Sequence, residues 1–238
     1  SDKTADLYAF DSRFTGKSSA FKVTYEGKTY QFETRLAGRF NIYNTLGAIG
    51  AALSEGISME TIAAAMKTFH SVPGRFELID EGQSFTVVVD YAHTPDGLEK
   101  ILTTAQEITK GRILVVFGCG GDRDKMKRPI MGRIAARYAD VAIVTSDNPR
   151  TEDPETIVKE VAAGVEEVKA EKPSLQVEVV VDRRSAIQKA ISLAKGDDIV
   201  LIAGKGHEDY QILKDKTIHF DDREEARKAL KESGAARF

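Results

Sequence analysis

Apolar and polar positions alternate in the first part of the chain and then change to a helical spacing. Residues 21–34 alternate on either side of a Glu-Gly pair, which predicts a β-hairpin. Residues 38–56 place isoleucines and leucines three and four positions apart and end at a glycine, as an amphipathic helix does. A second helix is expected over residues 58–69, with Ser58 as its cap.

The helical pattern stops where Val72 precedes Pro73. A residue before proline is disfavoured in the α-helical region, and Gly74 adds a further break. We therefore predict a domain boundary at this point, with one domain over residues 1–72 and another over residues 73–238.

The second domain is predicted to alternate strands and helices. Its continuous apolar runs are FTVVVDYAH, RILVVFG, DVAIVTS, VEVVV and DIVLIAG. Helices are expected to begin near Asp96, Pro129 and Pro154 and at RRSAIQKAISLAKG, with YQILKDKTIHF as a short hairpin and a last helix from about Asp221. Apolar runs without alternation, separated by helices, are typical of a parallel sheet covered on both faces. The predicted class is therefore α/β, with a doubly wound, mostly parallel, Rossmann-like sheet.

Composition narrows the class of protein. With 238 residues, 42% hydrophobic and 30% charged, the chain has the make-up of a soluble globular protein. A net charge of −3 offers no basic face for nucleic acid or an anionic membrane, and no apolar run approaches the ~20 residues of a membrane span. Cys119 is the only cysteine, which excludes a disulfide within the chain and suits a reducing cytoplasm.

The first residues lack Met and a signal-peptide pattern, so we expect a piece of a longer chain.

Polar residues and glycines follow several of the predicted strands. The segments concerned are DYAH (90–93), GCGGDRDKMKRP (118–129), SDNPR (146–150) and GKGHED (204–209). In an open parallel sheet, ligands bind beyond the carboxyl ends of the strands. Because these segments meet at one edge of the predicted sheet, we expect a binding site there.

Each of these segments also has a purely structural interpretation. Gly118 and Gly120 begin a dinucleotide fingerprint, but Arg123 stands where the third glycine belongs. His93 is as typical of a hydrogen-bonded loop as of a catalyst, and Asp147 and Asn148 are ordinary turn formers.

The chain is predicted to contain no phosphate loop. GKGHE lacks the required spacing, and TGKSS (15–19) has Asp11 where the earlier glycine belongs and leads into a hairpin rather than a helix.

Taken together, six segments resemble one family. NIYNTLGAIGAAL, PGRFE, VDYAHTPDGL, GCGGDRDKMKRP, DNPR and GKGHEDYQI occur in this order in the Mur ligases, so the resemblance runs from about residue 38 to the end. Residues 1–37 are only loosely similar to the family's central domain. The resemblance implies the tail of a central α/β ATPase domain joined to a whole C-terminal domain. The family's UDP-binding domain, phosphate loop and magnesium-holding modified lysine would lie outside this chain, which is expected to be inactive alone.

Within the family, the resemblance is to the ligases that add meso-diaminopimelate. It implies amide-bond formation with UDP-N-acetylmuramoyl-L-alanyl-D-glutamate through an acyl phosphate, in peptidoglycan precursor synthesis. The implied cofactors are ATP and Mg²⁺, and the implied partners are these small molecules rather than nucleic acid or a membrane. A cytoplasmic, monomeric parent enzyme is expected.

The resemblance also implies roles for particular residues. Binding of meso-diaminopimelate is implied for Arg123, Asp147, Asn148, Pro149, Arg150, Gly204 and Glu208. Contacts with ATP are implied for Asn44, Arg75 and Asp90, and site roles are possible for His93, Lys205 and His207. Arg150 and Arg123 would grip the substrate's extra distal carboxylate, Asp147 and Asn148 would shape the loop, and Glu208 would face the distal ammonium. No catalytic residue is certain and no metal ligand is implied. Without the family, a surface ion pair is the expected role of Arg75 and Asp90.

Two alternatives remain at this stage. A lysine-adding or folylpolyglutamate-type ligase could share the scaffold, although Arg150 argues against the first and GKGHEDYQI against the second. A non-catalytic nucleotide- or peptide-binding module belongs to a different class. Turnover with ATP, the UDP-linked dipeptide and diaminopimelate would separate an enzyme from a module.

Overall fold

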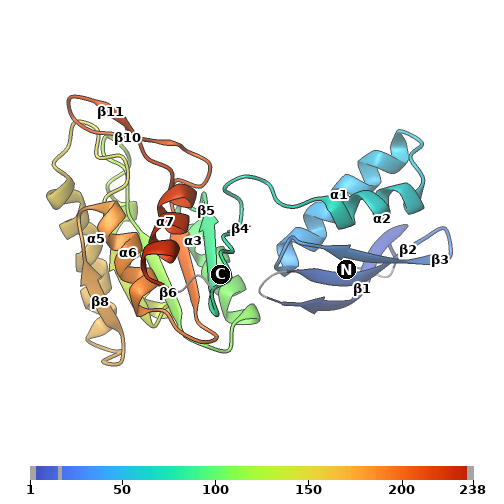
Figure 1. Ribbon diagram of the computed structural model, residues 1–238, viewed down its shortest axis with the longest axis horizontal. Coiled ribbons are helices and arrows are strands. Elements are labelled where there is room, and N and C mark those ends of the chain that lie inside the picture. The colour runs from blue at the N-terminus through green and yellow to red at the C-terminus, as the bar shows by residue number, and fades with distance from the viewer. Residues whose placement is uncertain (1–3, 16–17, 235–238) are drawn as a thin grey trace. The chain divides into compact units, whose positions relative to one another are not determined.

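The computed structural model describes residues 4–15 and 18–234 and contains two compact units, Ser1–Ser71 and Val72–Phe238 (Figure 1). The TGKSS segment that was tested as a phosphate loop includes residues 16 and 17, which lie outside the described residues.

The N-terminal unit combines an antiparallel sheet with two helices. Strands β1 (Leu7–Phe14), β2 (Ser19–Tyr25) and β3 (Lys28–Thr34) pair in that order. Helices α1 (Arg39–Ser54) and α2 (Met59–Thr68) follow, and the Ser58 side chain accepts the backbone N–H of Thr61. The predicted hairpin and both predicted helices are confirmed.

Strand β1 was not predicted. Its pairing with β2 shifts register between Phe10 and Arg13, and Asp11 in between has a φ of 51°. A bulge of this kind interrupts the alternation of apolar and polar positions by which a strand is recognised in sequence.

Apolar side chains from the sheet and both helices form the core of this unit. Phe21 and Phe32 stack with ring centroids 5.7 Å apart. Ile42 and Ile49 of α1 pack against them, and Ile62 of α2 completes the same cluster. The opposite side of α1 is exposed and carries Gly47, beside which a Cβ atom would meet nothing within 4 Å.

A Gly47→Ala variant is therefore expected to stabilise this unit by about 0.5–1 kcal/mol, because glycine in a helix interior loses more conformational entropy on folding than alanine. Urea denaturation would measure the change. Gly27→Ala is the matched control: its Cβ would also be free of contacts, but its φ of +74° disfavours alanine, so stability should fall. A Gly47→Ala variant no more stable than the wild type would contradict the prediction.

The C-terminal unit is built on one six-stranded sheet in the order β4-β5-β9-β6-β7-β8. Its strands are β4 (Glu77–Leu78), β5 (Thr86–Asp90), β6 (Ile113–Phe117), β7 (Val141–Val144), β8 (Gln176–Val179) and β9 (Ile199–Ala203). The short β4, which was not predicted, runs antiparallel to β5, and the remaining neighbours are parallel. The predicted doubly wound α/β class is confirmed.

Helices cover both faces of this sheet (Figure 1). They are α3 (Pro95–Ile108), α4 (Lys127–Tyr138), α5 (Pro154–Lys169), α6 (Arg183–Leu193) and α7 (Asp222–Glu232). Helices α6 and α7 share one core cluster with alternate residues of the strands, and α3, α4 and α5 pack side by side on the other face. Among the described residues, no helix combines the length and apolarity needed to cross a membrane.

The order of the strands places a site at one edge. The chain moves outward from β6 to β8, and α6 then returns it across the opposite face to β9, between β5 and β6. This reversal is the point at which open α/β sheets form a crevice at the carboxyl ends of their strands. The hairpin of β10 (Tyr210–Ile212) and β11 (Thr217–His219) follows β9.

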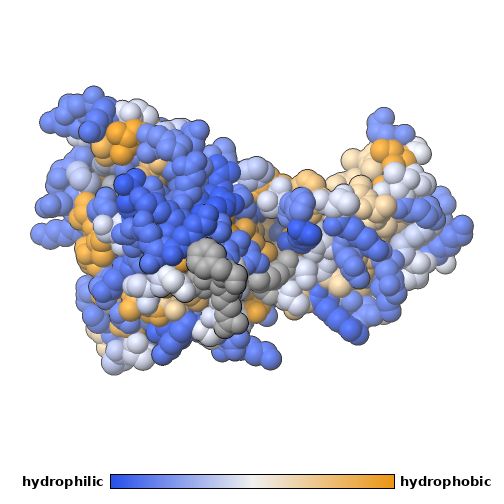
Figure 2. All heavy atoms as spheres, viewed as in Figure 1, coloured by the Kyte–Doolittle hydropathy of each residue, from blue (hydrophilic) through white to orange (hydrophobic). Residues whose placement is uncertain are grey.

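The outer surface of α7 is charged, and Figure 2 shows a largely hydrophilic surface on this side of the unit. Arg223 and Arg227 of α7 lie within 3.8 Å of Glu77 on β4, and Lys231 lies 3.6 Å from Glu81. These contacts attach the last helix to the antiparallel edge of the sheet. Exposed pairs of this kind contribute little to stability individually.

Candidate functional site

The DNPR loop (residues 147–150) leaves the carboxyl end of β7 and is mostly buried. Asn148 is 4% exposed, and both ends of its amide are engaged. Its Oδ1 accepts hydrogen bonds from Lys205 Nζ at 3.1 Å and from the backbone N–H of Ile212 at 2.9 Å, while its Nδ2 donates to Glu208 Oε2 at 3.0 Å. Asn148 therefore ties the GKGHED segment and β10 to this loop.

Strand β10 fixes the same loop through two further contacts. Gln211 Nε2 donates to the carbonyl of Asp147 at 2.8 Å, and the backbone N–H of Arg150 donates to the carbonyl of Ile212 at 3.0 Å. Arg150 has a φ of 54°, a conformation that few residues other than glycine adopt. Such backbone conformations persist where the surrounding structure enforces them, often at functional sites.

The Arg150 guanidinium is anchored at one nitrogen. Its Nη1 donates to the carbonyl of Gly121 at 2.9 Å and to that of Asn148 at 3.4 Å. Within residues 4–15 and 18–234, Nε and Nη2 make no hydrogen bond, so one edge of the guanidinium is available to a ligand. That edge presents two parallel N–H donors, the arrangement that matches a carboxylate.

The glycines of GCGGDR serve close packing between two loops. A Cβ at Gly121 would lie 1.9 Å from the carbonyl oxygen of Pro149, so only glycine fits there. At Gly120, a Cβ would lie 2.8 Å from Arg150 Nη1 and 3.9 Å from Arg123 Cγ. The side chains of both arginines that are predicted to bind the distal carboxylate thus lie close to Gly120. Arg123 itself is exposed and donates to the carbonyl of Asp122 at 2.9 Å.

A buried ion pair that was not predicted supports the GCGGDR segment, which carries Arg123. Arg128 is fully buried and donates to both carboxylate oxygens of Glu152, at 2.9 and 3.0 Å, and to Glu160 at 2.6 Å. Glu152 in turn accepts the backbone N–H of Asp122, next to Arg123, at 2.6 Å. The hydrogen bonds from Arg128, followed by that from Asp122, lower the pKa of Glu152 to about 2.

This lowered pKa predicts the pH dependence of a Glu152→Gln variant. The stabilisation by Glu152 is fully present above its ordinary pKa of about 4.5 and is lost as the pH falls through about 2. The variant should therefore be less stable than the wild type near neutral pH, and the difference should shrink between pH 4.5 and 2. Denaturation at a series of pH values would measure it. Glu167→Gln, which removes an exposed pair with Arg133, is the control and should cost little. A pH-independent difference would contradict the prediction.

The GKGHED segment meets the DNPR loop beyond β9. Lys205 is fully buried, and its Nζ lies 3.3 Å from Asp147 Oδ1 and 3.6 Å from Glu208 Oε2. Gly204 has a φ of 123°, and a Cβ there would approach Asp147 Oδ2 to 3.3 Å. The structure therefore brings four of the predicted substrate residues and Lys205 into one cluster; the four are Asp147, Asn148, Gly204 and Glu208. The carbonyl of Pro149 lies against Gly121 instead.

Arg183 and Asp222 lie beneath this cluster, and neither was predicted. Arg183 Nε and Nη2 each donate to an oxygen of Asp222 at 2.7 Å, and neither side chain is exposed. Nη2 also donates to the carbonyl of Ala203, the last residue of β9, at 3.0 Å. A signal was present, because DRRS follows VEVVV, a predicted strand whose following loop was not considered.

The residues predicted to contact ATP belong to both units, Asn44 to the N-terminal one and Arg75 and Asp90 to the C-terminal one. Asp90, 8% exposed at the end of β5, accepts the backbone N–H of Phe76 at 2.7 Å and that of Ala92 at 2.8 Å. Burial raises its pKa, against the effect of these two bonds and of the Arg75 charge. The expected surface ion pair is therefore wrong for Asp90, which is buried and bound to backbone amides. Asn44 lies in the N-terminal unit, exposed on α1, and donates to Asn41 Oδ1 at 3.2 Å.

Arg75 lies over the ring of Tyr91, which also contacts two histidine rings. Its guanidinium lies 4.8 Å from the centre of the Tyr91 ring. The rings of His93 and His207 lie 4.6 and 5.2 Å from that ring, and His93 Nδ1 lies 2.8 Å from the carbonyl of Tyr91. His93 thus has the contact expected of a hydrogen-bonded loop histidine. The group presents flat apolar faces and one cation beside the end of β5.

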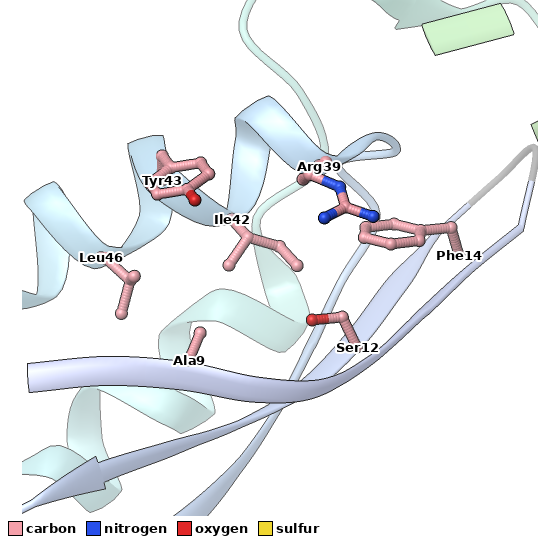
Figure 3. A pocket seen from close by; sticks show the side chains of 7 residues that line it. All are labelled: Ala9, Ser12, Phe14, Arg39, Ile42, Tyr43 and Leu46. Carbon is pink, nitrogen blue, oxygen red and sulfur yellow. The ribbon is translucent and has the colours of Figure 1, made fainter. Parts of the chain in front are cut away.

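The N-terminal unit has a cavity of its own, of about 260 Å³, between β1 and α1. Figure 3 shows Arg39 pointing toward the ring of Phe14, with Tyr43 on the same helix. None of the predicted site residues lines this cavity. Among the described residues, no group of three or more His, Cys, Asp or Glu side chains could hold a metal ion.

Two family models match the chain, one in each of the two units. The family model of the Mur ligase glutamate ligase domain matches residues 74–206, and that of the Mur ligase middle domain matches residues 1–52. The chain belongs to the Mur ligase family. The first match contains the DNPR loop, Gly204 and Lys205, so the cluster described above lies largely in a recognised Mur ligase domain.

Two relatives of this Mur ligase chain have the same name. The chain is 49% identical over 233 residues to the UDP-N-acetylmuramoyl-L-alanyl-D-glutamate–2,6-diaminopimelate ligase of Clostridium botulinum. It is 50% identical over 230 residues to the ligase of the same name from Geobacillus kaustophilus. These alignments cover 97% of the chain but only 47% and 46% of the relatives, so the chain spans about half of their length.

Solved structures agree with the fold. A structure of a UDP-N-acetylmuramoyl-L-alanyl-D-glutamate–2,6-diaminopimelate ligase is 36% identical, with a TM-score of 0.74, and the alignment covers 98% of this chain and 47% of that one. A folylpolyglutamate synthase from Thermotoga maritima is similar with a TM-score of 0.65 at 21% identity, over 84% of this chain and 44% of that one. The second likeness concerns the fold alone.

Proposed function

We propose that this chain is the amino-acid-binding part of an ATP-dependent ligase that adds meso-diaminopimelate to UDP-N-acetylmuramoyl-L-alanyl-D-glutamate. The observation that carries the proposal is the pairing of opposite charges at one edge of the sheet. The free edge of Arg150 lies in the loop whose Asn148 side chain holds the Glu208 carboxylate at 3.0 Å. A carboxylate and an ammonium on the same carbon atom need one cation and one anion held in this way.

Arg123 and Glu208 extend this complementarity. Arg123 passes Gly120 beside Arg150, which provides a second guanidinium for the same carboxylate. The known contacts of Glu208 with Asn148 and Lys205 both use Oε2, so Oε1 can accept from a substrate ammonium. The backbone at Gly204 would contact the same end of the substrate.

Selection against lysine follows from the same arrangement. Lysine carries the distal ammonium but lacks the carboxylate beside it. In a complex with lysine, the half-buried guanidinium of Arg150 would have no partner for its free edge. A buried donor left without a partner costs about 1–3 kcal/mol, and more when it is charged. Sites built around such a group reject the analogue that lacks its partner.

ATP would be bound by residues other than those that hold the amino acid. Residues 1–72 would form the tail of the central ATP-binding domain, and residues 73–238 the amino-acid-binding domain. Asn44, Arg75 and Asp90 would contact ATP, which supplies the phosphoryl group that activates the glutamate carboxylate. Each Asp90 oxygen accepts one backbone N–H and keeps a second lone pair for a hydroxyl donor. A monomeric parent enzyme in the cytoplasm, with magnesium held outside this chain, belongs to the same proposal.

Calorimetric titration of the 238-residue chain with meso-diaminopimelate, and with L-lysine as control, tests the proposal. Binding of meso-diaminopimelate alone is the expected result. Equal affinity for both amino acids would contradict the assignment of the substrate. Binding of neither would contradict the statement that this chain holds the amino acid without the rest of the ligase.

A further inference from the structure

Lys205 lies within a buried row of alternating charges. Asp222 pairs with Arg183 at 2.7 Å, and Lys205 lies between Asp147 at 3.3 Å and Glu208 at 3.6 Å. Gly204 lies between the Arg183–Asp222 pair and the charges around Lys205. A Cβ atom added at Gly204 would lie 3.8 Å from Arg183 Nη2 and 3.3 Å from Asp147 Oδ2. The row therefore runs from the core beneath the sheet edge to the Glu208 carboxylate.

The formal charges of the row do not cancel. Its three carboxylates and two cations leave a net formal charge of −1. Glu208, at the outer end, has the most exposed of the three carboxylates: 17% of its side chain is accessible, against 10% for Asp147 and 0% for Asp222. The remaining negative charge is thus presented where the substrate ammonium is proposed to bind.

Lys205 has no access to a ligand. Its side chain is 0% exposed, the Asn148 Oδ1 atom accepts from its Nζ at 3.1 Å, and the Tyr210 ring covers it with its centre 5.7 Å away. The ammonium can therefore act on a substrate only through its neighbours and through its field. Both routes end at the residues that are proposed to hold the distal end of the amino acid.

We propose that Lys205 is a positioning residue that makes the site select a zwitterionic distal group over a monocationic one. This inference rests on the proposed function. The distal end of meso-diaminopimelate carries one positive and one negative charge, whereas that of lysine carries one positive charge only. With Lys205 in place, the row offers a net charge of −1 to the ammonium, and the arginines accept the carboxylate.

Removal of the Lys205 charge would shift this balance toward lysine. The row would then carry a net formal charge of −2, and its field would favour a ligand group of charge +1 over one of charge 0. Charges in a poorly hydrated site interact much more strongly than in water. We expect the ratio of the affinities for meso-diaminopimelate and lysine to fall about tenfold or more, the scale on which charge mismatch affects recognition. A merely structural role would weaken the binding of both amino acids alike.

Titrations of four forms of the 238-residue chain test the inference. They are the wild type, Lys205→Met, Lys205→Met with Asp147→Asn, and Lys172→Met. The first variant should lose the preference for meso-diaminopimelate. The double variant restores the net formal charge of −1 and should recover part of the preference. Lys172, which lies in the loop between α5 and β8 and donates to the carbonyl of Ala139 at the end of α4 at 2.7 Å, is the matched control and should leave the ratio unchanged.

Urea denaturation of the same variants tests the charge row without any ligand. Lys205→Met leaves the carboxylates of Asp147 and Glu208 without their shared cation, so the double variant should be more stable than Lys205→Met although it carries one more substitution. A double variant less stable than the single one would overturn the charge row.

The failures of the two proposals are distinguishable. A wild type without preference for meso-diaminopimelate contradicts the proposed function, whatever the variants do. A wild type with the preference, together with a Lys205→Met variant that keeps the same ratio, leaves the proposed function intact and overturns the role of Lys205.

Discussion

An Arg150→Ala variant is expected to lose the preference for meso-diaminopimelate over lysine while keeping its fold. In the structure, Nη1 holds the guanidinium against the Gly121 carbonyl, so the position of its free edge is fixed before a ligand binds. A hydrogen bond to a charged group contributes about 1.5–3 kcal/mol, which corresponds to a roughly 10- to 150-fold loss of affinity for meso-diaminopimelate. Affinity for lysine should not fall and should rise if the unpaired guanidinium is what disfavours it, because lysine has no carboxylate for this edge and the variant has no donor left without a partner. Calorimetric titration measures both affinities.

Two further variants separate charge from geometry at this position. Arg150→Lys keeps the positive charge but offers no pair of parallel donors, so it should recover only part of the affinity. Arg133→Ala, which removes an exposed arginine paired with Glu167 at 2.9 Å, is the control and should leave binding unchanged. An Arg150→Ala variant that retains the full preference would assign the distal carboxylate to another group, with Arg123 the first to examine.

The location of this site could be predicted because it depends on local patterns. Continuous apolar runs separated by helical spacing identified the parallel strands of the C-terminal unit, and the carboxyl ends of parallel strands share one edge. Reading the polar residues after these runs therefore grouped Asp147, Asn148 and Glu208, which do contact one another or a common lysine. The roles of individual residues required the resemblance to a family, since each loop alone also had an ordinary structural interpretation.

The burial of the supporting residues could not be predicted in the same way, although the position of DRRS after the predicted strand VEVVV was a signal for Arg183. Arg128, Glu152, Arg183 and Asp222 look like surface charges on helices and loops, and burial becomes visible only when distant segments meet. The partners of Arg183 lie 20 and 39 positions away along the chain. The role of the glycines before Arg123 could not be predicted either. The sequence does not show that the carbonyl of Pro149 lies so close to Gly121 that only glycine fits there.

An Arg183→Met variant should show the largest loss of stability of the substitutions considered. It would leave the Asp222 carboxylate fully buried without its cation and would leave the carbonyl of Ala203 without the Nη2 donor. Breaking a buried pair by removing one partner costs about 3–5 kcal/mol, a large part of the total stability of an ordinary domain. Urea denaturation of the C-terminal unit within the whole chain would measure the loss.

The neighbouring residue supplies the control for this prediction. Arg184 pairs with Glu225 through two bonds of 2.8 Å, the same bidentate geometry as Arg183 with Asp222, but its side chain is 47% exposed. Arg184→Met should cost at most about 1 kcal/mol, since an exposed ion pair gains little over its hydrated parts. Adding Asp222→Leu to Arg183→Met should recover stability, because the buried charge is then absent. Equal losses of stability for Arg183→Met and Arg184→Met would mean that burial adds nothing to the contribution of the Arg183–Asp222 pair. The hydrogen bonds of Asn148 and Gln211 would then have to hold the substrate cluster in place.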